Sequence, residues 1–447
     1  MLPPIFDRGV AFFLPVNFMF KRIYQSQIAR GSLLIFIANS SVNFGNFLYN
    51  LLMARLLGKA DYGVLGSLLS LLVIVGLPLS ILNLHLIKAV SAYSGAGKIG
   101  KVKSLYQDLS WKFLGFGILV TVILLVFTPV ITGFLHLDNM TPLILIAVFS
   151  SAGGISVLYN SILNGLLAFG YLAFNGIGEI IVKLVSSVAL TFYFGFIGAV
   201  IGSALGGIFR LAAGILELKS IFRKTVREKS RFALLNLKDI MPVVVATLIL
   251  NSIINIDIIL VRHFFPDAVS GEYVALSTVS KIIFYATTPL ITIMFPYISK
   301  KKAAREPYIL ALFSGLTFAL FISLIVIFIF SFFPETIVGL LFGKEFLKII
   351  SHLVHFGFFI VFYNLNAILT FFFLSVSYNR ILYFLLFFPL LQVVLLAMFH
   401  QDLTQIINVN IIINLFYLFF ALIYLYRRES EEIYSIIRKI RAYTIHV

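Results

Sequence analysis

Long runs of apolar residues alternate with short polar stretches along this chain. The runs last about 20 residues or more and do not alternate apolar with polar positions, which favours membrane-spanning helices over barrel strands. Only helices and closed barrels satisfy their backbone hydrogen bonds in lipid, so we predict an all-α polytopic membrane protein. Its twelve expected spans are residues 31–54, 63–92, 109–134, 141–166, 171–194, 197–219, 241–264, 271–299, 308–333, 347–375, 379–400 and 404–426.

Two stretches of the sequence repeat one pattern. Residues 46–79 and 253–290 share an arginine, a tyrosine and a proline in the same order. The matched pairs are Arg55 with Arg262, Tyr62 with Tyr273, and Pro78 with Pro289. A second pairing lies later in each half, where Phe127–Leu143 resembles Phe332–Ile350. A membrane chain built as two like halves places its working site where the halves meet, which indicates a transporter.

The basic residues set the expected domains and orientation. Lysine and arginine concentrate in the N-terminal segment, the loops after the second and eighth spans, the central loop and the tail, which twelve spans place on one side. Because basic loops stay in the cytoplasm, both termini should be cytoplasmic. We expect a cytoplasmic or interfacial segment (1–30), a six-helix bundle (31–219), a basic linker (220–240), a second six-helix bundle (241–427) and a cytoplasmic tail (428–447).

The amino-acid composition limits which ligands and cofactors we expect. The chain is 61% hydrophobic and 12% charged, with a net charge of +16. Its excess of basic residues is explained by topology and by attraction to anionic membrane lipids, so we expect no nucleic-acid partner. There is no cysteine, and the seven histidines are scattered. We therefore predict no metal site, no cofactor and no catalytic residue.

Charged residues within the spans indicate a structural or functional role, because inserting each one into the bilayer core costs at least about 2.5–3.5 kcal/mol. In the fifth span, Asn175, Glu179 and Lys183 follow at intervals of four residues and share one helix face. They form either a self-neutralising Glu179–Lys183 pair or a cavity wall where Lys183 meets an anionic substrate and Glu179 exchanges a proton.

Asparagines form stripes in the first spans of both halves. The first stripe, Asn39, Asn43, Asn46 and Asn50, is either helix–helix glue or a cavity lining. The second contains Asn251 and Asn255, continues to Arg262, and leaves Asp257 nearby at a different angle, where it can pair with Lys281.

Basic residues outnumber acidic ones inside the spans, which suits a pyrophosphate ligand. The candidate substrate-binding residues are Arg55, Lys183, Arg210, Arg262, Lys281, Asn43, Asn46, Asn50, Asn251 and Asn255. Glu179 and Asp257 are the candidates for ion coupling. For Arg55 and Arg262 the alternative is snorkelling to the outer interface. Pro78 and Pro289 lie inside spans and provide either fixed curvature or hinges.

Three strings carry a family resemblance: ARLLGKADYGVL from residue 54, GFIGAVIGSALGG from residue 195 and LLFGKEF from residue 340. In this order they resemble the polysaccharide-transport branch of the multidrug/oligosaccharidyl-lipid/polysaccharide exporter superfamily, which includes bacterial O-antigen flippases. The resemblance spans residues 28–427. It implies a V-shaped pair of six-helix bundles working by alternating access on a polyprenyl-pyrophosphate-linked oligosaccharide in the cytoplasmic membrane of a prokaryote. It also implies a monomer working with glycosyltransferases and a glycan polymerase.

Two other functions remain to be weighed. A proton- or sodium-coupled multidrug or toxin exporter is expected to carry a buried carboxylate in its first bundle, commonly on the first span. Here that span has asparagines but no Asp or Glu. A membrane glycosyltransferase or polymerase needs a sizeable extramembrane loop, and the outer loops here are short. The sequence therefore favours a flippase, with the exporter as the alternative and no enzyme activity.

Overall fold

The computed structural model describes residues 27–229 and 237–444. Within these ranges the chain is helical without strands, and ten segments are long and apolar enough to cross a membrane. This confirms the all-α polytopic fold. The expectations for residues 1–26, for 230–236 of the linker and for the last three residues of the tail lie outside the described residues.

The first half consists of four long helices, of which two are folded back on themselves. They are α2 (Gln27–Gly95), α3 (Ile99–Phe134), α4 (Thr141–Gly165) and α5 (Phe169–Ile221). Straight, α2 would be roughly 100 Å long, far more than the bilayer core. It breaks at Gly58 (φ 71°) and α5 breaks at Gly195 (φ 56°), a conformation that glycine adopts at little cost. Dividing both helices there turns the ten described segments into the twelve expected spans.

Small residues hold the two arms of α5 together. Gly198, Gly202 and Gly206 recur every four residues on the arm after the break. Ser186 Oγ from the first arm donates to Gly202 O at 3.1 Å. A Cβ at Gly206 would stand 2.8 Å from the Glu179 carbonyl oxygen. Such small-residue spacing lets two membrane helices approach closely.

The second half is more interrupted. Its elements are α6 (Leu237–Ile253), α7 (Ile256–Phe264), α8 (Asp267–Ala303), α9 (Ile309–Phe332), α10 (Pro334–Leu341), η1 (Lys344–Ile349), α11 (Ile350–Ser375), α12 (Asn379–Leu385), α13 (Phe387–Met398) and α14 (Leu403–Thr444). The expected span 241–264 is thus a broken helix, α6 and α7. Helix α14 combines the last span with the described part of the tail and bends at Glu429.

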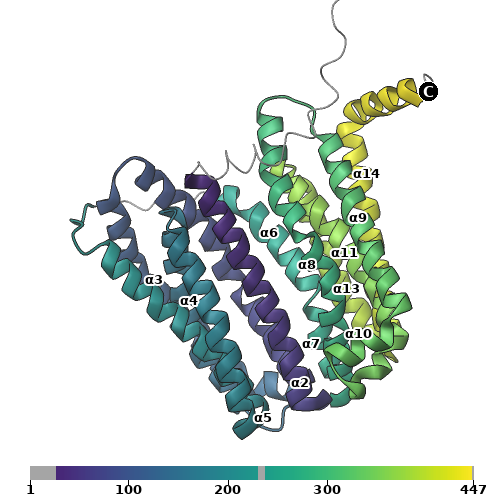
Figure 1. Ribbon diagram of the computed structural model, residues 1–447, viewed down its shortest axis with the longest axis horizontal. Coiled ribbons are helices and arrows are strands. Elements are labelled where there is room, and N and C mark those ends of the chain that lie inside the picture. The colour runs from purple at the N-terminus through teal and green to yellow at the C-terminus, as the bar shows by residue number, and fades with distance from the viewer. Residues whose placement is uncertain (1–26, 230–236, 445–447) are drawn as a thin grey trace, which may run out of the picture.

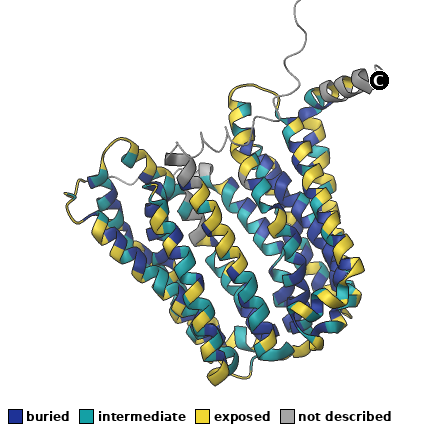
Figure 2. Cartoon of the chain, in the orientation of Figure 1, coloured by how far each residue is buried: buried dark blue, intermediate teal, exposed yellow. Residues whose placement is uncertain are grey.

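The two bundles converge at one face, here called the distal face, and diverge toward the proximal face, where the described chain begins and ends (Figure 1). Helix α2 packs against both α5 and α8 and so lies between the halves. The larger hydrophobic cluster fills the second bundle and includes residues near the break in α2 (Figure 2). A smaller cluster, with Leu86, Val90, Leu105, Leu163 and Phe222, stays inside the first bundle. The shared core therefore joins the halves on the distal side.

Candidate functional site

A cavity of about 890 Å³ lies between the first arm of α2 and α8, at the boundary between the halves. Its lining combines aromatic and polar side chains, with Phe36, Phe47 and Tyr285 beside Asn39 and Asn43. Pro289, one of the two predicted hinge prolines, also lines it, whereas Pro78 lies further along α2. The cavity therefore occupies the place that the internal repeat predicts.

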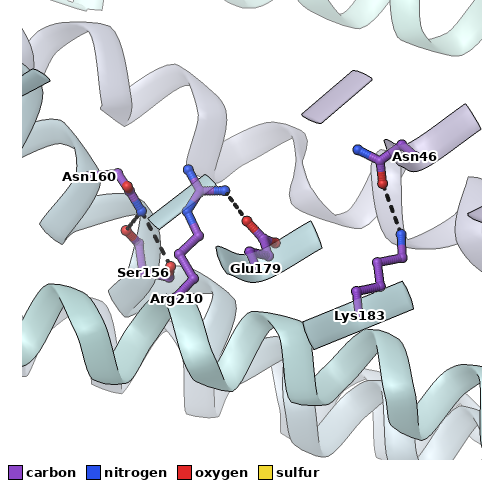
Figure 3. A network of polar contacts seen from close by, with 6 residues as sticks. All are labelled: Asn46, Ser156, Asn160, Glu179, Lys183 and Arg210. Atoms are coloured by element: carbon purple, nitrogen blue, oxygen red, sulfur yellow. Dashed lines mark hydrogen bonds and ion pairs between the residues drawn. The ribbon is translucent and has the colours of Figure 1, made fainter. Parts of the chain in front are cut away.

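The asparagine stripe of α2 leads from this cavity to Lys183. Asn43 is exposed in the cavity. One turn later, Asn46 Oδ1 accepts a hydrogen bond from Lys183 Nζ at 3.0 Å (Figure 3). The ammonium also lies 4.0 Å from the centre of the Tyr49 ring, a cation–π contact. Asn50 Nδ2 donates to the Asn46 carbonyl at 2.8 Å and completes the stripe.

Glu179 pairs with Arg210 and not with Lys183. Arg210 Nη1 lies 2.8 Å from Glu179 Oε2 across the two arms of α5 (Figure 3). Arg210 Nε is buried without a hydrogen-bond partner among the described residues. Asn160 of α4 lies on the other side of the guanidinium in the same view and donates to Ser156 O at 2.7 Å. None of the five ion pairs of the described chain includes Lys183.

In the second half the predicted polar residues surround the break between α6 and α7. Asn251 and Asn255 each bond a carbonyl four residues earlier, at 2.9 and 2.8 Å. Lys281 Nζ lies 3.4 Å from Ile254 O, a carbonyl that the break leaves free. The predicted pairing of Asp257 with Lys281 is not among the ion pairs within 4 Å that the described residues form.

Asp257 belongs to a buried network that the sequence did not reveal. Its Oδ2 accepts from the Tyr273 hydroxyl at 2.7 Å, and its Oδ1 from the Ile258 backbone N–H at 2.9 Å. Asn410 Nδ2 donates to the same hydroxyl at 3.0 Å, and Gln392 Nε2 donates to Asn410 Oδ1 at 2.8 Å. In the sequence, the sign of this network was the presence of amide side chains in the last two spans, Gln392 and Asn410.

Arg55 and Arg262 lie away from the cavity, on the distal side. Arg262 is 1% exposed and donates to the carbonyls of Leu135 and His136 at the end of α3. Arg55 donates to the carbonyls of Leu340 and Leu341 at the end of α10. The structure thus brings together the predicted residues of α2 and α5, and separately those around α7. Arg55 and Arg262 belong to neither group, because both contact carbonyls of the opposite half on the distal side.

Metal binding has no obvious site, since no group of three or more His, Cys, Asp or Glu that could hold an ion occurs in residues 27–229 and 237–444. The cavity lining instead provides the amides of Asn39 and Asn43, the asparagine stripe continues to the Lys183 ammonium, and the Glu179–Arg210 pair of α5 provides a guanidinium. These groups donate hydrogen bonds to an anion without a metal.

Comparisons with known proteins place this fold. Residues 28–302 match the family model described as polysaccharide biosynthesis protein. An inward-facing multidrug resistance MATE family transporter of the MOP superfamily is 15% identical with a TM-score of 0.67, covering 88% of this chain and 98% of its own. A structure described as the outward-facing conformation of a multidrug resistance MATE family transporter of the MOP superfamily is 16% identical, with a TM-score of 0.62 and coverages of 92% and 98%.

A third solved structure is a MOP superfamily transporter from Pyrococcus furiosus, described as having a binding pocket of reverse polarity. It is 17% identical, with a TM-score of 0.61 and coverages of 89% and 94%. The search of curated proteins gave no match. At these identities the solved structures establish the fold, and the family model covers well over half of the chain. The chain therefore belongs to the polysaccharide biosynthesis protein family, with the fold of the MATE transporters of the MOP superfamily.

Proposed function

We propose that this protein is a flippase that moves a polyprenyl-pyrophosphate-linked oligosaccharide, the repeat unit of a surface polysaccharide or O-antigen, across the cytoplasmic membrane by alternating access. The observation that carries the proposal is Lys183. Its ammonium lies within a membrane span, outside the ion pairs of the described chain, and bonds Asn46, one turn beyond the part of the asparagine stripe that lines the cavity. An unneutralised cation at that depth is costly, and an anionic ligand would compensate it.

The pyrophosphate and the sugars of the substrate would bind different side chains of the protein. Lys183 and Arg210 would take the pyrophosphate oxygens, which accept charge-assisted hydrogen bonds. Asn43, with its neighbour Asn39, offers amide donors and acceptors to sugar hydroxyls, and the cavity aromatics offer apolar faces. The other basic and amide candidates, Lys281, Asn251 and Asn255, would act from the second half when the bundles change their relative orientation.

Ion coupling would use Asp257 in preference to Glu179. Glu179 is neutralised by Arg210, whereas Asp257 is fully buried and bonded to a hydroxyl and a backbone N–H. Uptake of a proton or a sodium ion there would change the charge of the second bundle. On the orientation that the basic loops predict, the distal face is the outer face and both termini are cytoplasmic. Glycosyltransferases and a glycan polymerase are the expected partners of a monomer.

The alternative is a proton- or sodium-coupled multidrug exporter. The solved structures described as multidrug transporters have the same fold, but fold does not fix substrate. The observation that separates the two functions is charge. An organic cation would have to bind beside Lys183 and Arg210, and the carboxylate of Glu179 already pairs with Arg210.

Deletion of the protein tests the proposal in cells. Loss of the flippase should trap the lipid-linked oligosaccharide on the cytoplasmic leaflet and reduce surface glycan, as measured by leaflet-selective labelling. Normal surface glycan together with lost drug resistance would overturn the proposal in favour of the exporter.

Variants then test the site. Lys183→Gln and Arg210→Gln should fail to restore surface glycan to the deletion strain, at expression levels equal to the wild type. Lys112→Gln is the matched control, since this lysine is exposed on α3, away from the asparagine stripe of α2 and from the Glu179–Arg210 pair of α5. Full rescue by the double Gln variant would refute a cationic site.

A further inference from the structure

The duplicated arginines make the same contact in opposite directions across the boundary between the halves. Arg262, in the second half, donates from Nε to Leu135 O at 2.9 Å and from Nη2 to His136 O at 3.0 Å. Arg55, in the first half, donates from Nε to Leu341 O at 3.0 Å and from Nη2 to Leu340 O. In each case the guanidinium holds two successive carbonyls of the other half.

The carbonyls that they hold also correspond in the repeat. Leu135 and His136 follow Pro129 at the end of α3, and the matched segment of the second half places Leu340 and Leu341 after Pro334. Snorkelling would place each guanidinium in water or among lipid head groups. It does not explain why both arginines bond corresponding carbonyls of the opposite half. The repeat has therefore built a reciprocal pair of contacts, here called the arginine latches.

Close packing surrounds the latches. A Cβ on Gly271 of α8 would overlap the carbonyl group of Lys59, and one on Gly63 of α2 would stand 2.7 Å from the Gly271 backbone nitrogen. Lys59 Nζ pairs with Glu272 at 2.5 Å, and the Tyr62 hydroxyl lies 3.1 Å from Thr278 Oγ1. The distal parts of α2 and α8 thus meet with backbone nearly on backbone.

We infer that the arginine latches and this glycine seam form the gate that closes the distal face, and that they must part for the cavity to open there. The inference rests on the alternating access of the proposed function. It also assigns Arg55 and Arg262 a role in the conformational switch in place of direct substrate binding.

The two latches differ in strength. Arg262 is 1% exposed, whereas Arg55 is exposed. Arg262 also pairs with Asp267 at 2.7 Å, but this ion pair lies within the second half and does not cross the boundary. A buried guanidinium without its partners is costly, so loss of the Arg262 contacts should account for most of the opening barrier. Arg55 is then the latch that can be removed without endangering the fold.

Distance measurements on paired spin labels test the inference directly. Because the chain has no cysteine, labels can be placed on Asn139→Cys with Lys344→Cys at the distal side and on Ala96→Cys with Ala304→Cys at the proximal side. All four positions are exposed in the structure. The protein would be reconstituted in lipid nanodiscs and measured by double electron–electron resonance without substrate.

Two substitutions disrupt the gate in different ways, one by removing hydrogen bonds and one by steric overlap. Arg55→Ala removes charged hydrogen bonds and should raise the population of the long distal distance about tenfold. Gly271→Ala inserts a methyl group into the seam and should keep the distal side open. Lys112→Ala and Gly115→Ala are the matched controls, since both positions are exposed on α3 and a Cβ at Gly115 meets nothing within 4 Å.

Both gate variants should lengthen the distal distance and shorten the proximal one, while both controls keep the wild-type distributions. Wild-type distributions in Arg55→Ala and Gly271→Ala would overturn the inference. The readout needs no transport. If the gate variants open the distal side but the wild type fails to flip lipid-linked glycan, the gate stands and the proposed function falls.

Discussion

The Glu179–Arg210 pair yields the sharpest prediction, because its two members should affect ligand binding in opposite directions. Glu179→Gln frees the guanidinium for an anion, whereas Arg210→Gln removes it. Both substitutions remove one charge and break the same ion pair at 2.8 Å; Glu179→Gln keeps the side-chain size, and Arg210→Gln shortens the side chain. A role in folding alone would make the two variants alike, and a role in anion binding makes them opposite.

The magnitudes follow from distance and exposure. Unit charges about 4 Å apart interact by about 4 kcal/mol at an effective dielectric constant of 20. The side chains of Arg210 and Glu179 are 37% and 27% exposed, so solvent screening reduces this to about 1 kcal/mol. At 1.36 kcal/mol per tenfold, Glu179→Gln should tighten pyrophosphate binding about fivefold. Arg210→Gln forfeits a charged hydrogen bond of about 1.5–3 kcal/mol, which weakens binding by about ten- to 150-fold.

Isothermal titration of a short-chain polyprenyl pyrophosphate into the protein in nanodiscs measures both effects, and the corresponding polyprenyl alcohol reports binding of the lipid tail alone. The alcohol should bind all variants equally. Equal weakening of pyrophosphate binding by both substitutions, or no change with Arg210→Gln, would refute the reasoning and leave the pair as a structural contact between the arms of α5.

Three further variants extend the tests. Lys183→Met should weaken pyrophosphate binding about tenfold or more in the same titration, and Lys183→Arg should restore most of it. Gly206→Ala places a methyl group 2.8 Å from the Glu179 carbonyl oxygen and should lower the free energy of unfolding by about 1–3 kcal/mol, seen as a lower melting temperature than Gly115→Ala; equal melting would contradict tight packing in α5. Asp257→Asn should abolish the dependence of transport on a proton or sodium gradient while leaving pyrophosphate affinity unchanged, and gradient-driven transport by this variant would exclude Asp257 as the coupling group.

Much of the fold follows from the sequence because apolar runs of bilayer length have one workable structure in lipid. The twelve expected spans agree with the described helices once α2 and α5 are divided at Gly58 and Gly195. The break inside the span 241–264 was not predicted. Neither glycine nor proline occurs around Ile254 and Asn255. At the break, Lys281 and Gln392 donate from other helices to the carbonyls of Ile254 and Ile253, and such partners cannot be read from the sequence of the span itself.

The site was only partly predictable, for a reason of geometry. Helical spacing places Asn43, Asn46 and Asn50 on one face, and the cavity and Lys183 lie along that face. Periodicity within one helix does not say which residue of another helix it meets. The partner of Glu179 is therefore Arg210, on the other arm of α5, although Lys183 is its neighbour one turn later in sequence.

The single-residue reversals at Gly58 and Gly195 have a practical consequence for labelling live cells. Insertions are tolerated where exposed loops carry few contacts, and these hairpins have no loop to enlarge. On the proposed orientation, the distal face lies on the outer side of the membrane. It offers few sites where an antibody could bind or an epitope tag could be inserted. The segment between α3 and α4, with Asp138, Asn139 and Met140 exposed, is the preferred place for a tag that reports topology from outside.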